Sequence, residues 1–437
     1  MTTSQTSGTA VNSGLGCACG ESARSACAEE PPYGLYEGNQ YCVFHFPGEG
    51  KTAAFEKALA RKHDYNFQGF RFPCNPRFSN KVFDGPADFS ETVFNGPADF
   101  MSAVFNKEVK FFKAVFCSGA YFNGAEFCRG ASFKQARFNA GANFSETTFK
   151  QVIDANLSKK GNDFSYAAFN GELAFLETIF EGPVTFYSAT FKNRVRFCGR
   201  GDHVMFEGIS ASLDLQNARV ERPEWFSLCN LTARPSWFVY VDPRKFDLAN
   251  IKWNCSKVEE EIASLEARKV SESLGALETA CRRLAVNAEE SGEYRDASKL
   301  RYMALAAGRR KGWRGVELAI LGSVYWVGSG YGERVWQAAL MLVAILVVCA
   351  ALYSQVGFVR LQPKDASESE APAKPDEFGE PLKMPQALIY SAAVLTFQRP
   401  EPPPQTIAAQ TVVILETILG SVQAALLALA IRRKFMR

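Results

Sequence analysis

The spacing of phenylalanine constrains the fold of this chain more than any other feature. From Phe67 onward, phenylalanine returns in steps that alternate between five and six residues, so the repeat unit is eleven residues long. The first run is Phe67, Phe72, Phe78, Phe83, Phe89, Phe94, Phe100, Phe105, Phe111, Phe116, Phe122, Phe127, Phe133, Phe138, Phe144 and Phe149. After an insertion at residues 151–163 the spacing resumes at Phe164 and continues to Phe197. Neither one long amphipathic helix nor a simple hairpin meander has this spacing, so the pattern predicts a solenoid.

The alternating steps predict the shape of one coil. If each step is one side of a roughly square coil, two eleven-residue units complete a turn and the phenylalanines of successive coils stack inside. A small or β-branched residue two positions earlier, such as Ala98 or Thr147, then fills the gap beside each ring. Turn-forming pairs at Asp84-Gly85, Asn95-Gly96 and Asn123-Gly124 are expected at the corners. Each buried phenylalanine stabilises such a rod by about 1.5–3 kcal/mol, and the coils are expected about 4.8 Å apart.

Residues 67–215 resemble the Phe-rich variant of the pentapeptide-repeat family, in which a central Leu or Phe and a small residue two positions before it define the repeat. The resemblance implies a right-handed quadrilateral β-helix, which we expect over residues 64–240. A rod of this kind can serve as a spacer, a docking surface or a cap. In the docking role it would bind a cytosolic protein partner.

Residues 1–63 are expected to form a disordered segment that carries a metal site. The candidate ligands in this segment are Cys17, Cys19, Cys27, Cys42 and His45. Cys42 and His45 have the spacing of a bidentate zinc pair, and Cys27 with either Cys17 or Cys19 would complete a tetrahedral site. A Gly/Ser/Pro-rich segment has no core of its own to explain these cysteines. A structural zinc and a set of exposed thiols are the two interpretations.

Most of the chain is expected to lie in a reducing compartment. The other cysteines are scattered singly, and residues 1–16 lack the apolar segment of a secretory signal peptide. We therefore expect free thiols or metal ligands rather than a disulfide framework.

Composition and motifs exclude other classes of protein. A net charge of +3 points to no nucleic-acid partner. The chain is not expected to be an enzyme, because none of its three histidines sits beside a recognisable nucleophile or acid pair. The segment Gly48–Thr52 matches a phosphate-binding loop only by chance, because His45 stands where the first glycine of that motif is required.

Helices are expected after the β-helix. Residues 241–312 are rich in Ala, Leu, Glu and Arg and predict a helical neck of two antiparallel helices interrupted at Gly292. Residues 313–334 predict an interfacial segment whose Gly-Tyr-Gly sequence is a turn. Val335–Tyr353 and Ile407–Ile431 are each long and apolar enough to span a bilayer.

The charges around the two spans predict their orientation. Basic residues precede the first span at Arg309–Lys311 and follow the second at Arg432–Lys434, whereas the joining segment is acidic. By the positive-inside rule, the N-terminus, the β-helix and the C-terminus face the cytoplasm. The chain is therefore expected to be an integral protein of the plasma or inner membrane.

The segment between the spans resembles the pore loop of two-transmembrane potassium-type channels. Residues 386–395 are apolar but too short to cross, which suits a re-entrant pore helix. The family's motif T-V-G-Y-G-D-x-x-P-x-T lies over Thr396–Thr406 without a gap, and both Thr, the Pro and an acid in place of the Asp coincide. Over residues 335–437 the resemblance implies a homotetramer around an ion pore.

The predicted filter departs from that motif. It consists of Thr396, Phe397, Gln398, Arg399, Pro400 and Glu401. Gln398 and Pro400 replace glycines that a potassium filter needs for its backbone angles, so potassium selectivity is not expected. In a tetramer Arg399 would form a basic ring and Glu401 an acidic ring just outside it. This arrangement favours a weakly selective or anion-permeable pore over a cation-permeable one.

Two residues of the second span complete the predicted site. Glu416 is an ionisable residue within the membrane and is expected to hydrogen-bond to the pore helix. Gly420 either permits a gating bend or allows close helix packing. We therefore predict a multidomain ion channel in the lipid bilayer, with a cytosolic β-helix for regulation or docking. The alternative is a non-conducting, membrane-anchored scaffold for protein–protein interaction.

Overall fold

The structure is a computed structural model that describes residues 17–435 apart from 20, 28–29, 151–160, 202–204, 208–210, 256, 312–315, 333, 360–379, 402 and 405. The chain forms two compact units, Met1–Ala297 and Ser298–Arg437, which are described separately. Several positions used in the sequence analysis lie outside the described residues: His203, Trp313, most of the insertion in the repeats, and the acidic residues between 365 and 377.

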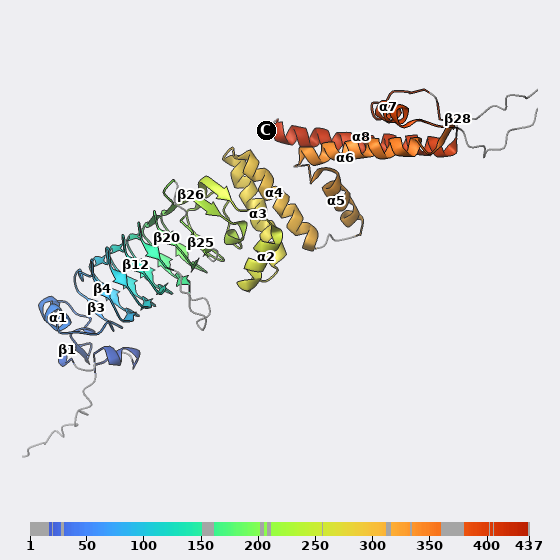
Figure 1. The fold of residues 1–437 in the computed structure, drawn as a ribbon. Coiled ribbons are helices and arrows are strands. Elements are labelled where there is room, and N and C mark those ends of the chain that lie inside the picture. Colours follow the sequence, from blue (N-terminus) through green and yellow to red (C-terminus); the bar gives the residue numbers. More distant parts are fainter. Residues whose placement is uncertain are drawn as a thin grey trace, which may run out of the picture. The chain divides into compact units, whose positions relative to one another are not determined.

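The first unit contains four parallel sheets, each named here after its first strand (Figure 1). The β3 sheet contains β3 (Arg71–Phe72), β6 (Val93–Phe94), β10 (Val115–Phe116), β14 (Arg137–Phe138), β18 (Ala168–Phe169), β22 (Thr190–Phe191) and β25 (Arg219–Val220). The β4 sheet contains β4 (Val82–Phe83), β8 (Val104–Phe105), β12 (Glu126–Phe127), β16 (Thr148–Phe149) and β20 (Ile179–Phe180).

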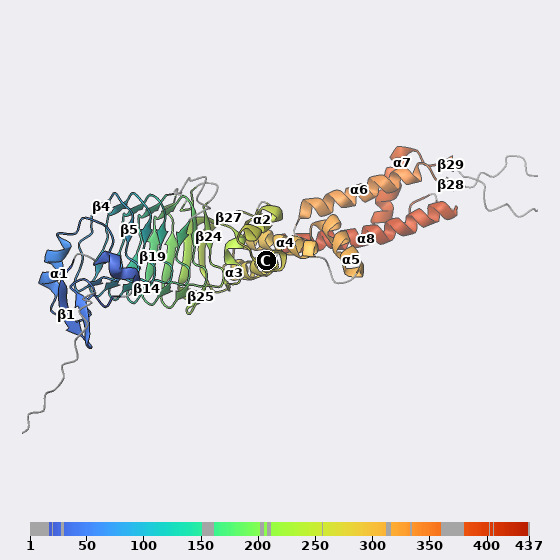
Figure 2. The same ribbon diagram turned by 90° about the horizontal axis from the view of Figure 1, so that it is seen from below.

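The β5 sheet contains β5 (Ala87–Asp88), β9 (Val109–Lys110), β13 (Ala131–Ser132), β17 (Asn162–Asp163), β21 (Pro183–Thr185) and β24 (Ser212–Asp214). The β7 sheet contains β7 (Ala98–Asp99), β11 (Ala120–Tyr121), β15 (Ala142–Asn143), β19 (Leu173–Leu176), β23 (Val195–Cys198), β26 (Phe226–Ala233) and β27 (Asp247–Trp253). Figure 2 shows the resulting stack of coils from a second direction.

The register of the strands agrees with the predicted coil. Phe72 pairs with Phe94 and Phe94 with Phe116, so each coil advances by two eleven-residue units. Across the insertion the pairing continues in register, because Phe138 pairs with Phe169. The prediction of a Phe-rich solenoid of short parallel strands is therefore confirmed.

The core of the coils is a set of stacked phenylalanine rings. The rings of Phe89 and Phe111 are 4.9 Å apart and nearly parallel, and both side chains are fully buried. The small residues two positions earlier are buried as well, as predicted. Where that position is threonine, its hydroxyl donates to a carbonyl of an adjacent coil, as Thr92 does to Phe67 O at 2.8 Å and Thr147 to Phe122 O at 2.8 Å. The threonine hydroxyl can therefore lie in an aromatic core with its hydrogen-bond donor satisfied.

Two backbone features form the corners of the coils. A residue in the left-handed region recurs every eleven positions, at Asn80, Glu91, Ser102, Lys113, Gly124, Gln135 and Glu146, and again at Tyr166, Glu177 and Ser188. Aspartates at the strand ends accept from the amide two residues on, as Asp88 does from Ser90. Gly96, which we expected at a corner for its flexibility, has an ordinary φ. A Cβ at that position would lie only 3.0 Å from the backbone of Cys74, so glycine is needed there for close approach.

Residues before the first coil form a structured cap (Figure 1). Its elements are the 3₁₀-helix η1 (Glu21–Ala26), the antiparallel strands β1 (Pro32–Tyr36) and β2 (Asn39–Cys42), and helix α1 (Thr52–Leu59). Phe44 stacks on Phe70 at 4.2 Å, and Phe55 contacts Phe72 at 5.1 Å. The described part of the segment that we assigned as disordered is therefore ordered, because its own aromatic residues bury the open end of the rod.

The last coils are covered in turn by 3₁₀-helices and α-helices. These are η2 (Pro223–Trp225), η3 (Pro235–Phe238), α2 (Val258–Ala267) and α3 (Ser273–Glu290). Strand pairing continues to Trp253, beyond the boundary expected at residue 240. Asn287 of α3 donates to the carbonyls of Pro243 and Phe246 at 3.0 and 2.7 Å. Helix α3 thus satisfies backbone groups of the final turn of the rod.

One pair of cysteines departs from the expectation of free thiols. Cys198 of β23 and Cys229 of β26 form a disulfide. They are paired in register on adjacent strands, which brings their Cα atoms within 4.6 Å. Their separation of 31 residues differs from the regular coil spacing, such as that between Phe72 and Phe94, so the repeat does not reveal the contact.

The second unit is helical. Helix α4 (Tyr294–Lys311) begins at the boundary and is followed by α5 (Val316–Ser329), α6 (Val335–Tyr353), strands β28 (Gly357–Val359) and β29 (Glu380–Pro381), α7 (Met384–Leu395) and α8 (Ile407–Phe435). Two segments, Val335–Tyr353 and Ile407–Arg432, are long and apolar enough to cross a membrane. Helix α6 lies beside α8, and the shorter α7 packs on both. This arrangement agrees with two spans and a short helix between them.

Candidate functional site

The first candidate site lies in the N-terminal cap. The donor atoms of Cys17, Cys27, Cys42 and His45 all lie within 4.8 Å of one another. Cys27 follows η1, Cys42 ends β2, and a tight turn brings His45 back, with its amide 3.2 Å from Cys42 O. Cys17 approaches from the preceding segment and accepts a hydrogen bond from the Cys42 amide at 3.2 Å. Three thiols and one imidazole at this spacing can bind a metal ion.

The surroundings of His45 orient its ring for this role. Its Nε2 lies 2.9 Å from the carbonyl oxygen of Gln68, to which it donates, and its Nδ1 faces Cys42 Sγ at 3.1 Å. Metal-binding histidines are usually oriented in this way, with one ring nitrogen donating to a carbonyl while the other faces the metal ligands. His45 is 4% exposed, so the ring is held away from water.

Two thiols of the cluster have pKa values shifted in opposite directions. The hydrogen bond from the Cys27 thiol, together with His45, lowers the pKa of Cys42 to about 4 against the opposing effect of burial. The same hydrogen bond, together with burial, raises the pKa of Cys27. Lys51 is fully buried beside the cluster and donates to Val43 O and Phe44 O at 3.0 and 3.2 Å. Burial lowers the pKa of Lys51 to about 7, while the charge on Cys42 acts in the opposite direction.

The structure separates the two cysteines that the sequence left as alternatives. Cys17 belongs to the group of four, and Cys19 does not. Cys19 lies just outside, with its Sγ 3.4 Å from the Sγ of Cys27, and it is partly exposed. Lys51 belongs to the phosphate-loop match that we attributed to chance. In the structure its side chain is buried in the cap and donates to backbone carbonyls there.

The second candidate site is in the helical unit, around Glu416. This carboxylate is fully buried on α8. It accepts a hydrogen bond from Tyr353 Oη of α6 at 2.5 Å and another from Ser391 Oγ of α7. The predicted bond between Glu416 and the short helix is therefore present, and a second one joins α8 to α6. We refer to these three residues as the Glu416 cluster.

Two further residues of α8 show how closely its helices pack. A Cβ at Gly420 would collide with Leu395 at the end of α7, so glycine at this position allows close helix packing. One turn further, the side chain of Gln423 is 4% exposed and donates to Gly328 O and Ala338 O at 2.6 and 2.8 Å. Gln423 thereby joins α8 to the end of α5 and to α6.

The predicted filter residues follow α7 on the surface of the unit. Thr396, Phe397, Gln398, Arg399 and Glu401 are exposed, and Pro400 is half-buried. The amides of Phe397 and Gln398 donate back to Val394 O and Ala393 O at 3.0 and 2.9 Å, and Phe397 has a φ of 60°. This is a Schellman-type helix end, which a non-glycine residue forms only at a steric cost.

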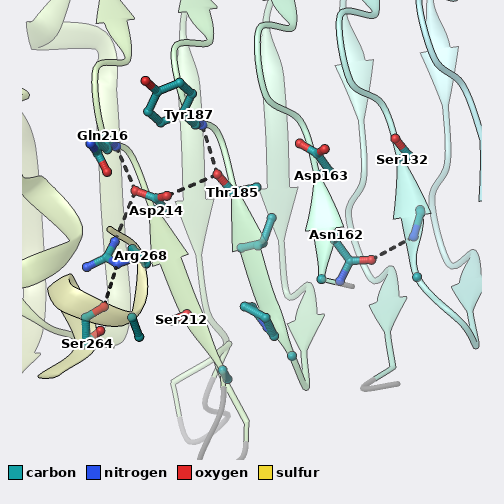
Figure 3. A pocket seen from close by; sticks show the side chains of 18 of the residues that line it. Ser132, Asn162, Asp163, Thr185, Tyr187, Ser212, Asp214, Gln216, Ser264 and Arg268 are labelled. Atoms are coloured by element: carbon teal, nitrogen blue, oxygen red, sulfur yellow. Dashed lines mark hydrogen bonds and ion pairs between the residues drawn. The ribbon is translucent and has the colours of Figure 1, made fainter. Parts of the chain in front are cut away.

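A groove of about 1050 Å³ lies on the β5 sheet of the first unit (Figure 3). Its floor carries Ser132, Asp163, Thr185 and Asp214, which occupy equivalent positions in successive coils. Arg268, just after α2, closes one end by donating to Asp214 at 3.1 Å. The sequence analysis did not identify this groove, because residues far apart in the chain line it.

Other residues of the candidate sites also escaped the sequence analysis. Tyr353 and Ser391 bind Glu416, and Gln68 orients His45 through a backbone carbonyl. A tyrosine and a serine within apolar helices do not by themselves indicate a site. A contact through a backbone carbonyl does not depend on the identity of the side chain, so the sequence does not predict it.

No protein-family model, no curated protein and no solved structure matches this chain. Its function therefore has to be argued from the two candidate sites and the architecture that holds them.

Proposed function

We propose that this chain is a subunit of a tetrameric ion channel of the two-transmembrane pore-loop type. Helices α6 and α8 span the bilayer, and α7 enters it from one side as the pore helix. The N-terminal unit, with the right-handed course that its repeats suggest, lies in the cytoplasm, as does the C-terminus. The membrane is then the plasma or inner membrane, and the chain catalyses no reaction.

The Glu416 cluster is the observation that supports this proposal most directly. A carboxylate buried on a span carries a large desolvation cost unless it is hydrogen-bonded, and such residues usually serve a function. Here both bonds of Glu416 hold the short helix and the first span in place. A scaffold that needed α6 and α8 only as anchors would have no use for a polar attachment of α7.

The pore loop determines what the channel conducts. In a tetramer, the exposed side chains of Arg399 would form a basic ring, with Glu401 forming an acidic ring outside it. The turn at Phe397 uses the last carbonyls of α7 within the chain, so fewer of them remain for a cation. We propose a weakly selective or anion-permeable pore, in which Arg399 sets the preference.

Single-channel recording of the purified protein in planar bilayers under a KCl gradient tests this function. A reversal potential toward chloride that moves toward potassium in Arg399→Glu supports the proposal. A preference unchanged by this substitution rejects the role of the ring. A folded tetramer that never conducts favours the alternative, a membrane-anchored scaffold, which the degenerate filter sequence also supports.

We further propose that the Cys17, Cys27, Cys42 and His45 group binds a structural zinc. The donor set, the orientation of the His45 ring and the hydrogen bond from the Cys42 amide to Cys17 Sγ fit a tetrahedral site. Zinc would hold η1, β2 and the following turn together over the first coil. Native mass spectrometry should find one zinc per chain, which is lost in Cys42→Ser and retained in Cys74→Ser. Equal metal content in the two variants would count against the site.

We propose that a cytosolic protein docks on the β-helix, with the groove of Figure 3 as its place of contact. The groove contains both acidic and basic side chains, including Asp163, Arg129 and Lys269. A photo-crosslinking residue in place of Tyr187, within the groove, should capture a partner. The same residue in place of Tyr121, on the β7 sheet, serves as the control, and equal capture at both positions would argue against the groove.

A further inference from the structure

We propose that Cys19 and Cys27 form an oxidation-sensitive pair, and that their conversion to a disulfide releases the metal from the N-terminal cap. The inference rests on the zinc site proposed above, because Cys27 is one of its four donors. It goes beyond that site by giving a role to the one cysteine of the cap that the donor set does not use.

The sulfur atoms of Cys19 and Cys27 lie close together without a covalent bond between them. Cys19 Sγ lies 3.4 Å from Cys27 Sγ, so a shift of a little over one ångström would bring the pair to a disulfide length of about 2.05 Å. Besides this contact with Cys27, the Cys19 thiol donates a weak hydrogen bond to Cys17 O at 3.7 Å.

Exposure determines which sulfur an oxidant meets first. Cys17 and Cys19 are partly exposed, whereas Cys27 and Cys42 are 6% and 1% exposed, and of the two partly exposed sulfurs Cys19 is the one outside the donor set. Hydrogen peroxide that reaches Cys19 oxidises it to a sulfenic acid, with the O–O bond broken and one water released. The buried Cys27 sulfur then attacks Cys19 Sγ, the S–O bond breaks, and the hydroxyl leaves as a second water. Overall, two thiols lose two electrons and one peroxide is reduced to two waters.

The consequence for the metal follows from the donor count. Once Cys27 is bonded to Cys19, only Cys17, Cys42 and His45 remain, and a structural zinc site requires four ligands. The cap then loses its cross-link between η1 and β2. Thiol–disulfide exchange with a cytosolic dithiol would restore Cys27 and allow the metal to return. The cap is thereby sensitive to peroxide in a reversible way.

The test uses the full-length protein in detergent and begins with its zinc content. Hydrogen peroxide is added, and released zinc is followed with a chromogenic chelator. Wild type and Cys74→Ser should release zinc at the same rate, because Cys74 is a partly exposed cysteine outside the cluster. Cys19→Ser should hold as much zinc as wild type before treatment and release it at most about one fifth as fast, because Cys27 then has no cap sulfur outside the donor set with which to form a disulfide.

The identity of the bond is checked separately by mass spectrometry. Trypsin cleaves after Arg24 and a glutamate-specific protease after Glu29, which separates Cys27 from Cys19 on one side and from Cys42 on the other. Oxidised wild type should yield a fragment that links Cys19 to Cys27 and disappears with dithiothreitol.

Each other outcome counts against the pair. Release from Cys19→Ser at the wild-type rate, or Cys27 linked to Cys17 or Cys42, would overturn it. Loss of zinc from untreated Cys19→Ser would make Cys19 a ligand and overturn it as well. Untreated wild type without any zinc would refute the metal site itself and the release with it.

Discussion

At the scale of single residues, the repeat places the same amino acid in opposite environments. Phe111 is fully buried between the rings of Phe89 and Phe133, at centroid distances of 4.9 and 4.8 Å. The next residue, Phe112, is half-buried on the outside, with Lys113 Nζ 5.1 Å from its ring. Successive residues of an extended chain point to opposite sides, so position alone separates core from surface.

Replacing these neighbours should therefore have unequal effects. Phe111→Ala removes a ring from the stack and should lower the free energy of unfolding by about 3–5 kcal/mol. Phe112→Ala should cost less than about 1 kcal/mol, since it removes only surface contacts. Thermal unfolding of the two full-length variants, followed by circular dichroism in detergent, compares them directly. Similar losses would mean that the coil repacks around the missing ring.

A buried carboxylate in the C-terminal part of the first unit predicts a pH dependence. Glu261 is 2% exposed, and burial raises its pKa above 4.5 even though Oε2 accepts from the Ser236 amide and Arg234 lies 3.8 Å away. A group whose pKa is raised on folding stabilises the fold at low pH. That contribution is lost as pH rises through its folded pKa.

Glu261→Gln removes this titration. The stability of wild type relative to the variant should be highest at and below pH 4.5 and should fall as the pH rises through the raised pKa of Glu261. Melting temperatures of both proteins across this range measure the difference. Glu260→Gln, on the exposed face of α2, should follow wild type throughout. Parallel curves for wild type and Glu261→Gln would show that the carboxylate keeps its charge through Arg234.

At the scale of secondary-structure elements, polar side chains decide how the apolar helices fit together. Apolar helix surfaces gain little by leaving lipid tails for one another. Hydrogen bonds and close contacts therefore select one arrangement of the helices. Glu416 joins α8 to α6 and α7, and Gln423 joins it to α5 and α6. Both residues lie on one face of α8, where Gly420 allows the end of α7 to approach.

Loss of the Glu416 carboxylate should loosen α7. Glu416→Leu removes the carboxylate that accepts from Tyr353 Oη and one of the two acceptors of Ser391 Oγ, which also donates to Leu346 O, and should cost about 1–3 kcal/mol. Thr417→Val is a matched control, because the Thr417 hydroxyl donates to Val413 O of its own helix. Fluorescence-detected size exclusion after heating would rank the variants. Equal thermal stability of the two would show that packing alone holds α7.

At the scale of the whole molecule, each unit has its own core. The rod is closed at one end by aromatic residues of the cap and at the other by α2 and α3. Repeat proteins depend on such terminal elements, because an uncovered coil exposes its hydrophobic interior.

A fragment of residues 1–297 should therefore fold without the helical unit and unfold cooperatively. A fragment ending at residue 257 lacks α2 and α3 and should aggregate or melt at a lower temperature, because the carbonyls that Asn287 binds lose their partner. Circular dichroism and light scattering of the two purified fragments test this. Identical behaviour would mean that the helices do not act as a cap.

The sequence by itself determined the features that repeat or that depend on one local pattern. The phenylalanine spacing predicted the coil, its register and its core, because in-register stacking makes every coil the neighbour of an almost identical one. Length and hydropathy predicted two candidate spans and the short helix between them. A cysteine-rich segment predicted a donor group, since thiols and imidazole are recognisable by residue type alone.

Only the tertiary structure decided which side chains meet. It selected Cys17 over Cys19, joined Cys198 to Cys229, and gave Glu416 its partner on α6. It also showed that the cap is ordered and that the strands continue to Trp253. These outcomes depend on contacts between residues far apart in the chain. The packing of the whole unit determines such contacts. Local propensity does not, because it depends on neighbouring residues alone and not on which distant residue lies beside them.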